Sequence, residues 1–256
     1  MPDDITVRLR VKDSVVKFGD LHALGPLSFD VKAGKCVVLL GPSGCGKSTL
    51  LAALAGLQSL SSGEVWAEQS QGQGNKPAGF VFQDANLLGW ASALHNVALP
   101  LALAKLPRAQ QTRRAIDALV SVGLGDFIDA RPKALSGGMA MRVALARAMV
   151  ANPEVLLLDE PFGAIDELSR RDLNDLVHKL KREAHVAILF VTHSVEEAVY
   201  MADTILVLSP RPGKIIATID VRQSARDRAF LLTDTFAQTV MRVRRALASG
   251  ADAKVI

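Results

Sequence analysis

Cysteine is scarce in the 256-residue sequence: only Cys36 and Cys45 are present, too few for a disulfide framework. A disulfide at Cys45 would distort the glycine-rich segment around it, so free thiols and a reducing compartment are expected. Cys45 also lies near Lys47 and a predicted helix start, and both neighbours favour the thiolate form. The cysteine content therefore excludes a disulfide-stabilised domain and singles out one thiol of expected reactivity.

Long uninterrupted apolar runs are missing as well. The most apolar long stretch, residues 87–104, contains His95, Asn96 and Pro100 and falls short of a membrane span. The opening residues, MPDDITVRLRVKD, lack the apolar core of a signal peptide. We therefore expect a soluble chain, so that any membrane role would come through a partner.

Charge of one sign is only in slight excess, with a net charge of +4 and a sequence pI near 9.2. This excess fits a nucleotide ligand, a membrane-facing partner or no special partner. The basic clusters at 112–114 and 242–245 are typical of solvated helix faces, so nucleic-acid binding is not expected. Apolar residues make up 49 % of the chain, which is enough for a sizeable core.

Buried strands and helices alternate along the sequence. The runs at 35–40, 154–159 and 186–192 are mostly apolar, as strands of a parallel sheet are, and 203–209 is a further strand. Amphipathic periodicity predicts helices over 167–184 and within 226–248, the latter as one helix or a pair. This alternation predicts a single α/β domain with a parallel-sheet core over about 1–85 and 152–222. Short strands within 5–40 would form an antiparallel β subdomain, 86–151 an inserted helical subdomain, and 223–256 a C-terminal helical segment.

A phosphate-binding loop is predicted from GPSGCGKST, residues 41–49, which matches G-x-x-x-x-G-K-[ST] between a strand and a helix. Glycines turn backbone N–H groups toward phosphate oxygens, lysine reaches the terminal phosphates, and the next hydroxyl is a magnesium ligand. The expected nucleotide ligands are Gly41, Pro42, Ser43, Gly44, Cys45, Gly46, Lys47, Ser48 and Thr49.

Polar residues follow three further strands. Asp159 and Glu160 end the buried run VLLLDE, where Asp159 is placed to hold magnesium and Glu160 to activate water. His193 follows FVT and Gln83 follows AGFVF, at the sheet edge where ligands of parallel sheets gather. Phe18 is either an adenine-stacking residue or a core residue.

A second helix start, LSGGM at 135–139, presents Ser136 as an N-cap followed by two glycines but has no lysine. Its free N–H groups suit an anion.

These residues together resemble the ATPase subunit of ABC transporters, over nearly the whole chain. The resemblance implies a P-loop (RecA-like) core, ATP and Mg²⁺ as cofactors, and two subunits paired head-to-tail. In this family the signature motif of one subunit covers the γ-phosphate held by the other. The residues carried over are the signature Leu135, Ser136, Gly137, Gly138 and Met139, the Q-loop Gln83, the D-loop Asp166, the adenine-stacking Phe18, the catalytic Glu160 and His193, and the magnesium ligands Ser48, Gln83 and Asp159.

A narrower resemblance joins the chain to importers of nitrate, sulfonates and taurine, through VFQDANLLGW, NVALPL, PFGAID and VLSPRPGKI. It implies permease partners, a second ATPase subunit, an indirect solute-binding protein, no nucleic acid, and a peripheral place on the cytoplasmic face of the inner membrane. Ala140 and Met141 depart from the polar residues usual behind the signature, Ile165 from a D-loop leucine, and Gly89 from a proline.

Alternatives remain at this stage. The chain could be a soluble ABC-type ATPase acting on nucleic acid or ribosomes, although such relatives carry long insertions or tandem units. A purely regulatory nucleotide binder would lack Glu160 or His193, and an exporter ATPase would usually be fused to a membrane domain. The solute, the permease, the choice between homodimer and paralogue pair, and the effect of Ala140 and Met141 on turnover stay open.

Overall fold

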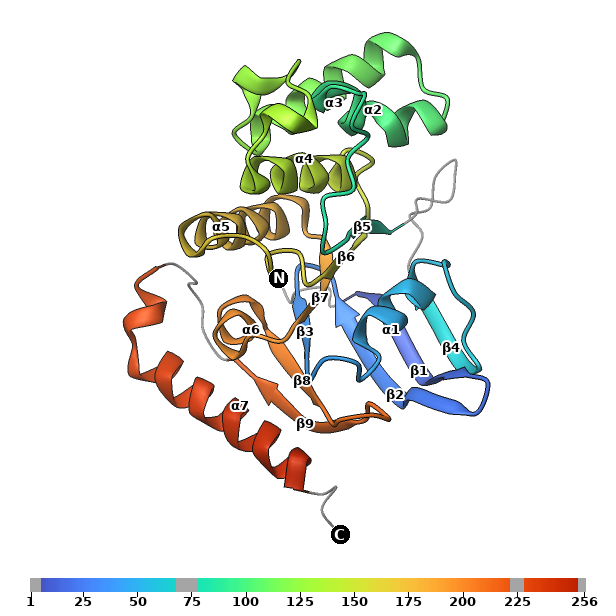
Figure 1. Ribbon diagram of the computed structural model, residues 1–256, viewed down its shortest axis with the longest axis vertical. Coiled ribbons are helices and arrows are strands. Elements are labelled where there is room, and N and C mark those ends of the chain that lie inside the picture. Colours follow the sequence, from blue (N-terminus) through green and yellow to red (C-terminus); the bar gives the residue numbers. More distant parts are fainter. Residues whose placement is uncertain (1–5, 68–77, 222–227, 253–256) are drawn as a thin grey trace.

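A mostly parallel sheet forms the centre of the protein (Figure 1). The computed structural model describes residues 6–67, 78–221 and 228–252, and within them this sheet has six strands in the order β5-β6-β7-β3-β8-β9. Only β9 runs antiparallel to its neighbour. The strands are β3 Cys36–Leu40, β5 Gly79–Val81, β6 Val155–Asp159, β7 Ala187–Thr192, β8 Thr204–Leu208 and β9 Ile215–Asp220.

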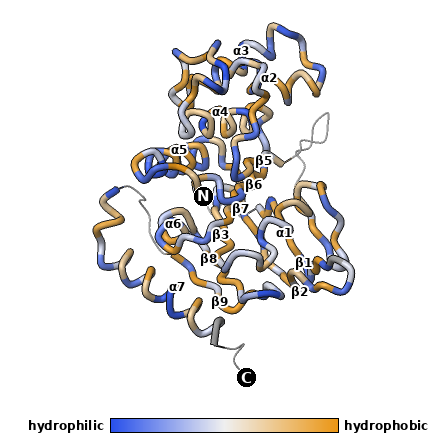
Figure 2. The backbone as a smooth tube through the Cα atoms, viewed as in Figure 1, coloured by the Kyte–Doolittle hydropathy of each residue, from blue (hydrophilic) through white to orange (hydrophobic). Residues whose placement is uncertain are grey.

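Both faces of the central sheet are covered. All residues of β3 and β7 are buried, which explains why their sequences are apolar without alternation. Val38 and Leu40 pack into the core shared with the helices α4 to α7, while Val37 and Leu39 pack into a second core on the other face. Figure 2 shows these strands as the apolar centre of the chain.

The second core lies between the central sheet, α1 (Lys47–Leu54) and a three-stranded antiparallel sheet of order β2-β1-β4. The expected α/β fold with an added antiparallel β layer is therefore confirmed. The strands of the smaller sheet are β1 Val7–Phe18, β2 Leu21–Lys32 and β4 Ser62–Ala67.

A group of helices forms the upper end of the molecule in Figure 1, beyond the β5 edge of the sheet. Its members pack on one another through Val97, Leu101, Leu119 and Leu145, all of them buried. The elements are α2 Ala93–Leu103, α3 Arg108–Ser121, the 3₁₀ turns η1 Gly125–Phe127 and η2 Pro132–Ala134, and α4 Gly137–Met149.

The remaining helices are α5 (Glu167–Ala184), α6 (Val195–Met201), the turn η3 (Phe230–Leu232) and α7 (Asp234–Asp252). The helix predicted over 167–184 is confirmed with the same bounds. The C-terminal helix begins later than expected because the Thr233 hydroxyl accepts a hydrogen bond from the Phe236 amide at 3.2 Å and caps it there. Within the described part of the chain, no helix is long and apolar enough to cross a membrane.

Candidate nucleotide-binding site

Three strands of the central sheet end side by side. Leu40 at the end of β3 lies opposite Thr192 at the end of β7, and Asp159 at the end of β6 lies opposite Val191. Because parallel strands end at one edge, the segments that follow them meet there. This register brings together the glycine-rich loop, Glu160 and His193.

The glycine-rich loop has the backbone that a phosphate cradle needs. Gly44 and Gly46 adopt positive φ values of +77° and +98°, which only glycine does without strain. A Cβ atom at Gly46 would also lie 2.7 Å from the Leu24 Cβ. The loop then enters α1 at Lys47, so free N–H groups of a helix start face the same space.

Lys47 is a buried ammonium, with 4 % of its surface exposed. Its Nζ donates to the carbonyl oxygens of Gly41 at 2.8 Å and Pro42 at 3.0 Å. It also lies 3.8 Å from Glu160 Oε1. A buried cation needs an anionic partner, so this loop fits a phosphate group.

Two oxygen ligands of the kind that magnesium prefers lie next to the loop. The Ser48 hydroxyl donates to Asp159 Oδ1 at 2.8 Å. Burial raises the pKa of Asp159, while the Ser48 hydrogen bond opposes the rise. Gln83 is exposed and lines the same cavity, of about 380 Å³, as Lys47 and Ser48.

Glu160 and His193 form a pair at the edge of this cavity. The His193 Nδ1 lies 2.7 Å from Glu160 Oε2. Glu160 has a positive φ of +45°, a conformation that is uncommon for a non-glycine residue and clusters at functional sites. A carboxylate held between an ammonium and an imidazole can accept a proton from a nearby water.

The second helix start lines a different cavity, of about 220 Å³, with Ser136, Gly138 and Met139. Ser136 is the N-cap of α4, and its Oγ accepts from the Met139 amide at 3.2 Å. Gly137 is exposed and Leu135 packs on the core. The start of α1, with Lys47, and the start of α4, with Ser136, therefore line two separate cavities of the same chain.

Asp166 caps α5, because its Oδ1 accepts from the Ser169 amide at 3.0 Å. These hydrogen bonds lower the pKa of Asp166. Phe18 ends β1, and its side chain lies outside the part of the structure that is described.

The expected thiolate at Cys45 is wrong. The side chain is buried, with 1 % of its surface exposed. Burial raises the pKa of the thiol and outweighs the nearby Lys47 ammonium. The cysteine is instead a small apolar residue inside the loop.

Residues that sequence reasoning did not assign also line the cavity beside the loop: Leu21, Ala23 and Arg211. Leu21 and Ala23 come from β2, and no local pattern marks them. Arg211 belongs to the RPG turn, which the sequence marks without indicating that it folds back onto the loop.

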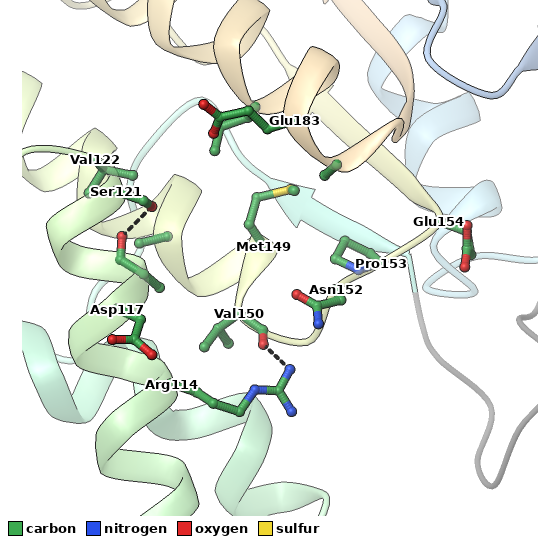
Figure 3. A pocket seen from close by; sticks show the side chains of 14 residues that line it. Arg114, Asp117, Ser121, Val122, Met149, Val150, Asn152, Pro153, Glu154 and Glu183 are labelled. Atoms are coloured by element: carbon green, nitrogen blue, oxygen red, sulfur yellow. Dashed lines mark hydrogen bonds between the residues drawn. The ribbon is translucent and has the colours of Figure 1, made fainter.

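Another cavity, of about 550 Å³, lies at the opposite, amino-terminal edge of the sheet (Figure 3). Glu154 directly precedes β6 there, and Asp117 and Glu183 add carboxylates. Its Arg114 donates to the Val150 carbonyl at 2.6 Å. An acidic lining does not suit a polyphosphate, so the nucleotide site is the cavity at the carboxyl edge.

The fold and this edge define a P-loop nucleotide-binding protein. The ABC transporter family profile matches residues 24–163, more than half of the chain. The chain belongs to the ABC transporter family, and it is an ATPase of that family.

Several curated relatives are similar along most of their length. The taurine import ATP-binding protein TauB of Rhizobium johnstonii is 42 % identical over 239 residues, which cover 91 % of each protein. The aliphatic sulfonates import ATP-binding protein SsuB 1 of Xanthomonas axonopodis pv. citri is 43 % identical, over 78 % of this chain and 80 % of that protein.

Solved structures agree with the fold. The ATP-binding cassette MJ0796, in a dimeric post-hydrolysis state bound to ADP and Pi, superposes with a TM-score of 0.72 at 30 % identity, covering 84 % of this chain and 99 % of that one. CbiO1 of Clostridium perfringens, part of the ABC transporter complex cbiONQ, superposes with a TM-score of 0.75 at 26 % identity, covering 97 % and 99 %.

Proposed function

We propose that the protein is the ATP-hydrolysing subunit of an importer for a small anionic or zwitterionic solute of the taurine and sulfonate type. The relatives named for taurine and aliphatic sulfonate import support this solute class. They favour it over the readings of a soluble ATPase on nucleic acid or an exporter. One observation supports ATP hydrolysis most directly. At one edge of the sheet, Lys47 lies beside the Ser48–Asp159 pair and the Glu160–His193 pair.

ATP is held in this proposal by the loop from Gly41 to Thr49, with Lys47 at the terminal phosphates. Ser48, Asp159 and Gln83 would hold Mg²⁺, and the bound ion would neutralise charge on the phosphate oxygens. Phe18 is proposed to stack on the adenine. The fit of the site rests on the buried Lys47 ammonium and on the adjacent hydroxyl and carboxylate oxygens.

Glu160 is proposed to take the proton of the attacking water. The 2.7 Å contact with His193 would fix the direction of its carboxylate, and the Lys47 ammonium lies 3.8 Å from the other carboxylate oxygen. His193 itself is exposed, so its other ring nitrogen is free to meet the γ-phosphate. Asp166, at the start of α5, would meet the partner subunit.

Two subunits would complete each other's sites. Residues 86–151 would act as the helical signature subdomain, presenting Leu135 to Met139 to the γ-phosphate held by the partner's loop. A separate permease would span the membrane, a solute-binding protein would act through it, and this subunit would work at the cytoplasmic face of the inner membrane.

The test removes the proposed base. Glu160→Gln should still bind ATP while its hydrolysis rate falls by about 10²-fold or more, the scale of general-base loss. Glu183→Gln, in the cavity at the opposite edge of the sheet, is the matched control and should hydrolyse ATP at the wild-type rate. Near wild-type hydrolysis by the Glu160 variant contradicts its role.

Deletion of the gene in the source organism tests the solute. Growth with taurine or alkanesulfonates as the sole sulfur source should stop, and nitrate should be compared as sole nitrogen source. Wild type should restore growth and Glu160→Gln should not. Undiminished growth of the deletion strain on all three, without a second transporter for them, contradicts the proposed solutes.

A further inference from the structure

The RPG turn, Arg211 to Gly213, connects β8 and β9. It folds back onto the phosphate loop. The Arg211 Nε donates to the Gly44 carbonyl at 3.0 Å, and Arg211 lines the same cavity as Lys47 and Ser48. The loop and this turn are 167 residues apart in sequence, so the fold alone brings them together.

Gly213 holds the turn in place from its other end. Its N–H donates to the Ala23 carbonyl at 3.1 Å, and its carbonyl accepts from the Gly25 amide at 2.8 Å. A Cβ atom at Gly213 would lie 2.2 Å from the Cys45 carbonyl oxygen. Only glycine therefore fits between the phosphate loop and β2.

The body of the turn is braced independently of the Arg211 side chain. The Ser209 hydroxyl donates to the Pro212 carbonyl at 2.9 Å and accepts from the Lys214 amide at 3.0 Å. The Ser209 amide donates to the Lys214 carbonyl at 2.9 Å. Loss of the Arg211 guanidinium would therefore leave the turn folded. A substitution of Arg211 thus tests the side chain without disturbing the backbone of the turn.

The hydrogen bond from Arg211 to the Gly44 carbonyl also orients the N–H group of Cys45. A peptide is planar, and its C=O and N–H point in opposite directions. Arg211 holds the Gly44 carbonyl toward itself, so the Cys45 N–H is turned into the loop. The Cys45 nitrogen lies 3.4 Å from the Pro42 carbonyl oxygen. This hydrogen bond is long, so an anion in the loop can take the place of the Pro42 oxygen as its acceptor.

Arg211 also brings charge to the cavity. Its side chain is exposed, and among the residues that the structure describes it has no carboxylate within ion-pair distance. Lys47 is buried and Arg211 is exposed, and both line this cavity. The two side chains would therefore give the cavity two positive charges.

We propose that Arg211 is a positioning residue of the nucleotide site, which aims the Gly44–Cys45 peptide at the phosphates of a bound nucleoside di- or triphosphate. Its guanidinium adds attraction for the same phosphates. The inference rests on the proposed function, since it needs a nucleotide in the cavity. It goes beyond it by giving the RPG turn a part in phosphate binding.

The experiment compares Arg211→Met, Arg211→Lys and Lys214→Met in otherwise intact protein. Lys214 is an exposed cation on the same turn that lines a neighbouring cavity, which makes it the matched control. The probes are the fluorescent trinitrophenyl derivatives of ATP and of adenosine. Arg211→Met should weaken binding of the ATP derivative about tenfold, as the loss of one charge-assisted hydrogen bond does.

The adenosine derivative, which has no phosphate, should bind all variants alike. Arg211→Lys keeps the charge and a donor, so it should restore most of the affinity. In ATPase assays Arg211→Met should raise KM for ATP about tenfold. Its kcat at saturating ATP should stay within about twofold of wild type, because the Cys45 N–H would bind the phosphates equally well in the ground state and the transition state.

Three results overturn the inference: equal affinity of Arg211→Met and wild type for the ATP derivative, equal loss in Lys214→Met, or equal loss for both probes. Arg211→Gln replaces the methionine variant if that chain aggregates, with the same expected loss. Failure of the wild-type protein to bind the ATP derivative would instead contradict the proposed function.

Discussion

Glu197 is a partly buried acid four residues after the proposed catalytic histidine. The Thr192 hydroxyl donates to Glu197 Oε2, and the Thr192 oxygen accepts from the Ser194 amide at 3.0 Å. The chain on either side of His193 is therefore tied to Glu197. Burial raises the pKa of Glu197, against opposing contributions from the Thr192 hydrogen bond, Arg170 and His193.

The sign of this shift predicts a pH-dependent stability. A carboxyl group whose pKa is higher in the folded protein binds protons more tightly there. The contribution of the protonated Glu197 to the stability of the fold is fully present below the ordinary pKa of 4.5. It is lost as the pH rises through the raised pKa of the folded protein. Glu197→Gln, which cannot ionise, should therefore unfold at a higher urea concentration than wild type at pH 8, and this difference should shrink toward pH 5.

Glu196→Gln is the control for this measurement. Glu196 is exposed and pairs with Arg244 at 2.6 Å, so its replacement should change stability little at either pH. A Glu197 variant whose stability relative to wild type is the same at pH 5 and pH 8 would contradict the titration of this group.

At the residue scale, sequence reasoning predicted those site residues that short motifs mark. Lys47, Ser48 and Asp159 meet as expected, because a loop and a strand end are local features. The thiol state of Cys45 could not be predicted, since it depends on burial by residues far away in sequence. Arg211 was missed for the same reason, because its contact with Gly44 exists only after the sheet has formed.

At the scale of elements, the loop before α2 is shaped by one buried side chain. Asn96 is fully buried. Its Oδ1 accepts from the Leu88 amide at 2.7 Å, and its Nδ2 donates to the carbonyls of Leu88, Ala91 and Ser92 at 3.2, 3.3 and 3.0 Å. The Asn96 side-chain amide thus binds four backbone groups on either side of Trp90.

Asn96→Ala should lower the free energy of unfolding by about 1–3 kcal/mol, because buried backbone groups of this loop would lose their partner. Urea unfolding followed by circular dichroism measures the loss. Gln110→Ala, an exposed amide on the neighbouring helix α3, is the control and should change little. Equal stability of the two variants would show that Asn96 does not hold the loop.

Trp90 itself points outward, with 77 % of its surface exposed. An exposed tryptophan on the loop that follows Gln83 in the sequence suits contact with a permease. Trp90→Ala should leave the isolated subunit as stable as wild type but reduce its recovery with the permease after detergent extraction. Trp66→Ala, an exposed tryptophan on β4, should not reduce it, and undiminished recovery of the Trp90 variant contradicts the docking role.

Sequence patterns predicted some of the helices and strands but not all of them. The apolar runs of β6, β7 and β8 and the amphipathic α5 were predicted because each pattern is complete within its own segment. β9 was not, since Ile215–Asp220 is a half-exposed edge strand whose pairing with β8 depends on the intervening turn. Strand order in the sheet has no local pattern at all.

At the scale of the whole molecule, the two anion-facing helix starts belong to separate cavities, one with Lys47 and one with Ser136. In the proposed function, the first helix start would bind the phosphates of ATP and the second would cover the phosphates held by the partner subunit. A two-fold pair of subunits would use both, because each cover would meet the other subunit's loop. The dimeric form of the similar cassette MJ0796 supports such a pair.

This arrangement predicts complementation between damaged subunits. Lys47→Ala breaks the loop and Ser136→Arg breaks the cover, so each homodimer has two broken sites. A dimer with one copy of each has one site in which both defects coincide and one that is intact. Transporters purified through a different tag on each copy should therefore trap ATP at one site.

A second pairing reverses the expectation and makes the test decisive. When both substitutions are placed in one subunit and its partner is wild type, each shared site contains one broken part, so no ATP should be trapped. If each subunit closed its own site, the wild-type partner would still trap ATP, and the first pairing would trap none. Occlusion of labelled ATP after removal of free nucleotide measures both pairings beside a wild-type control, and the pattern opposite to the one expected rules out the shared site.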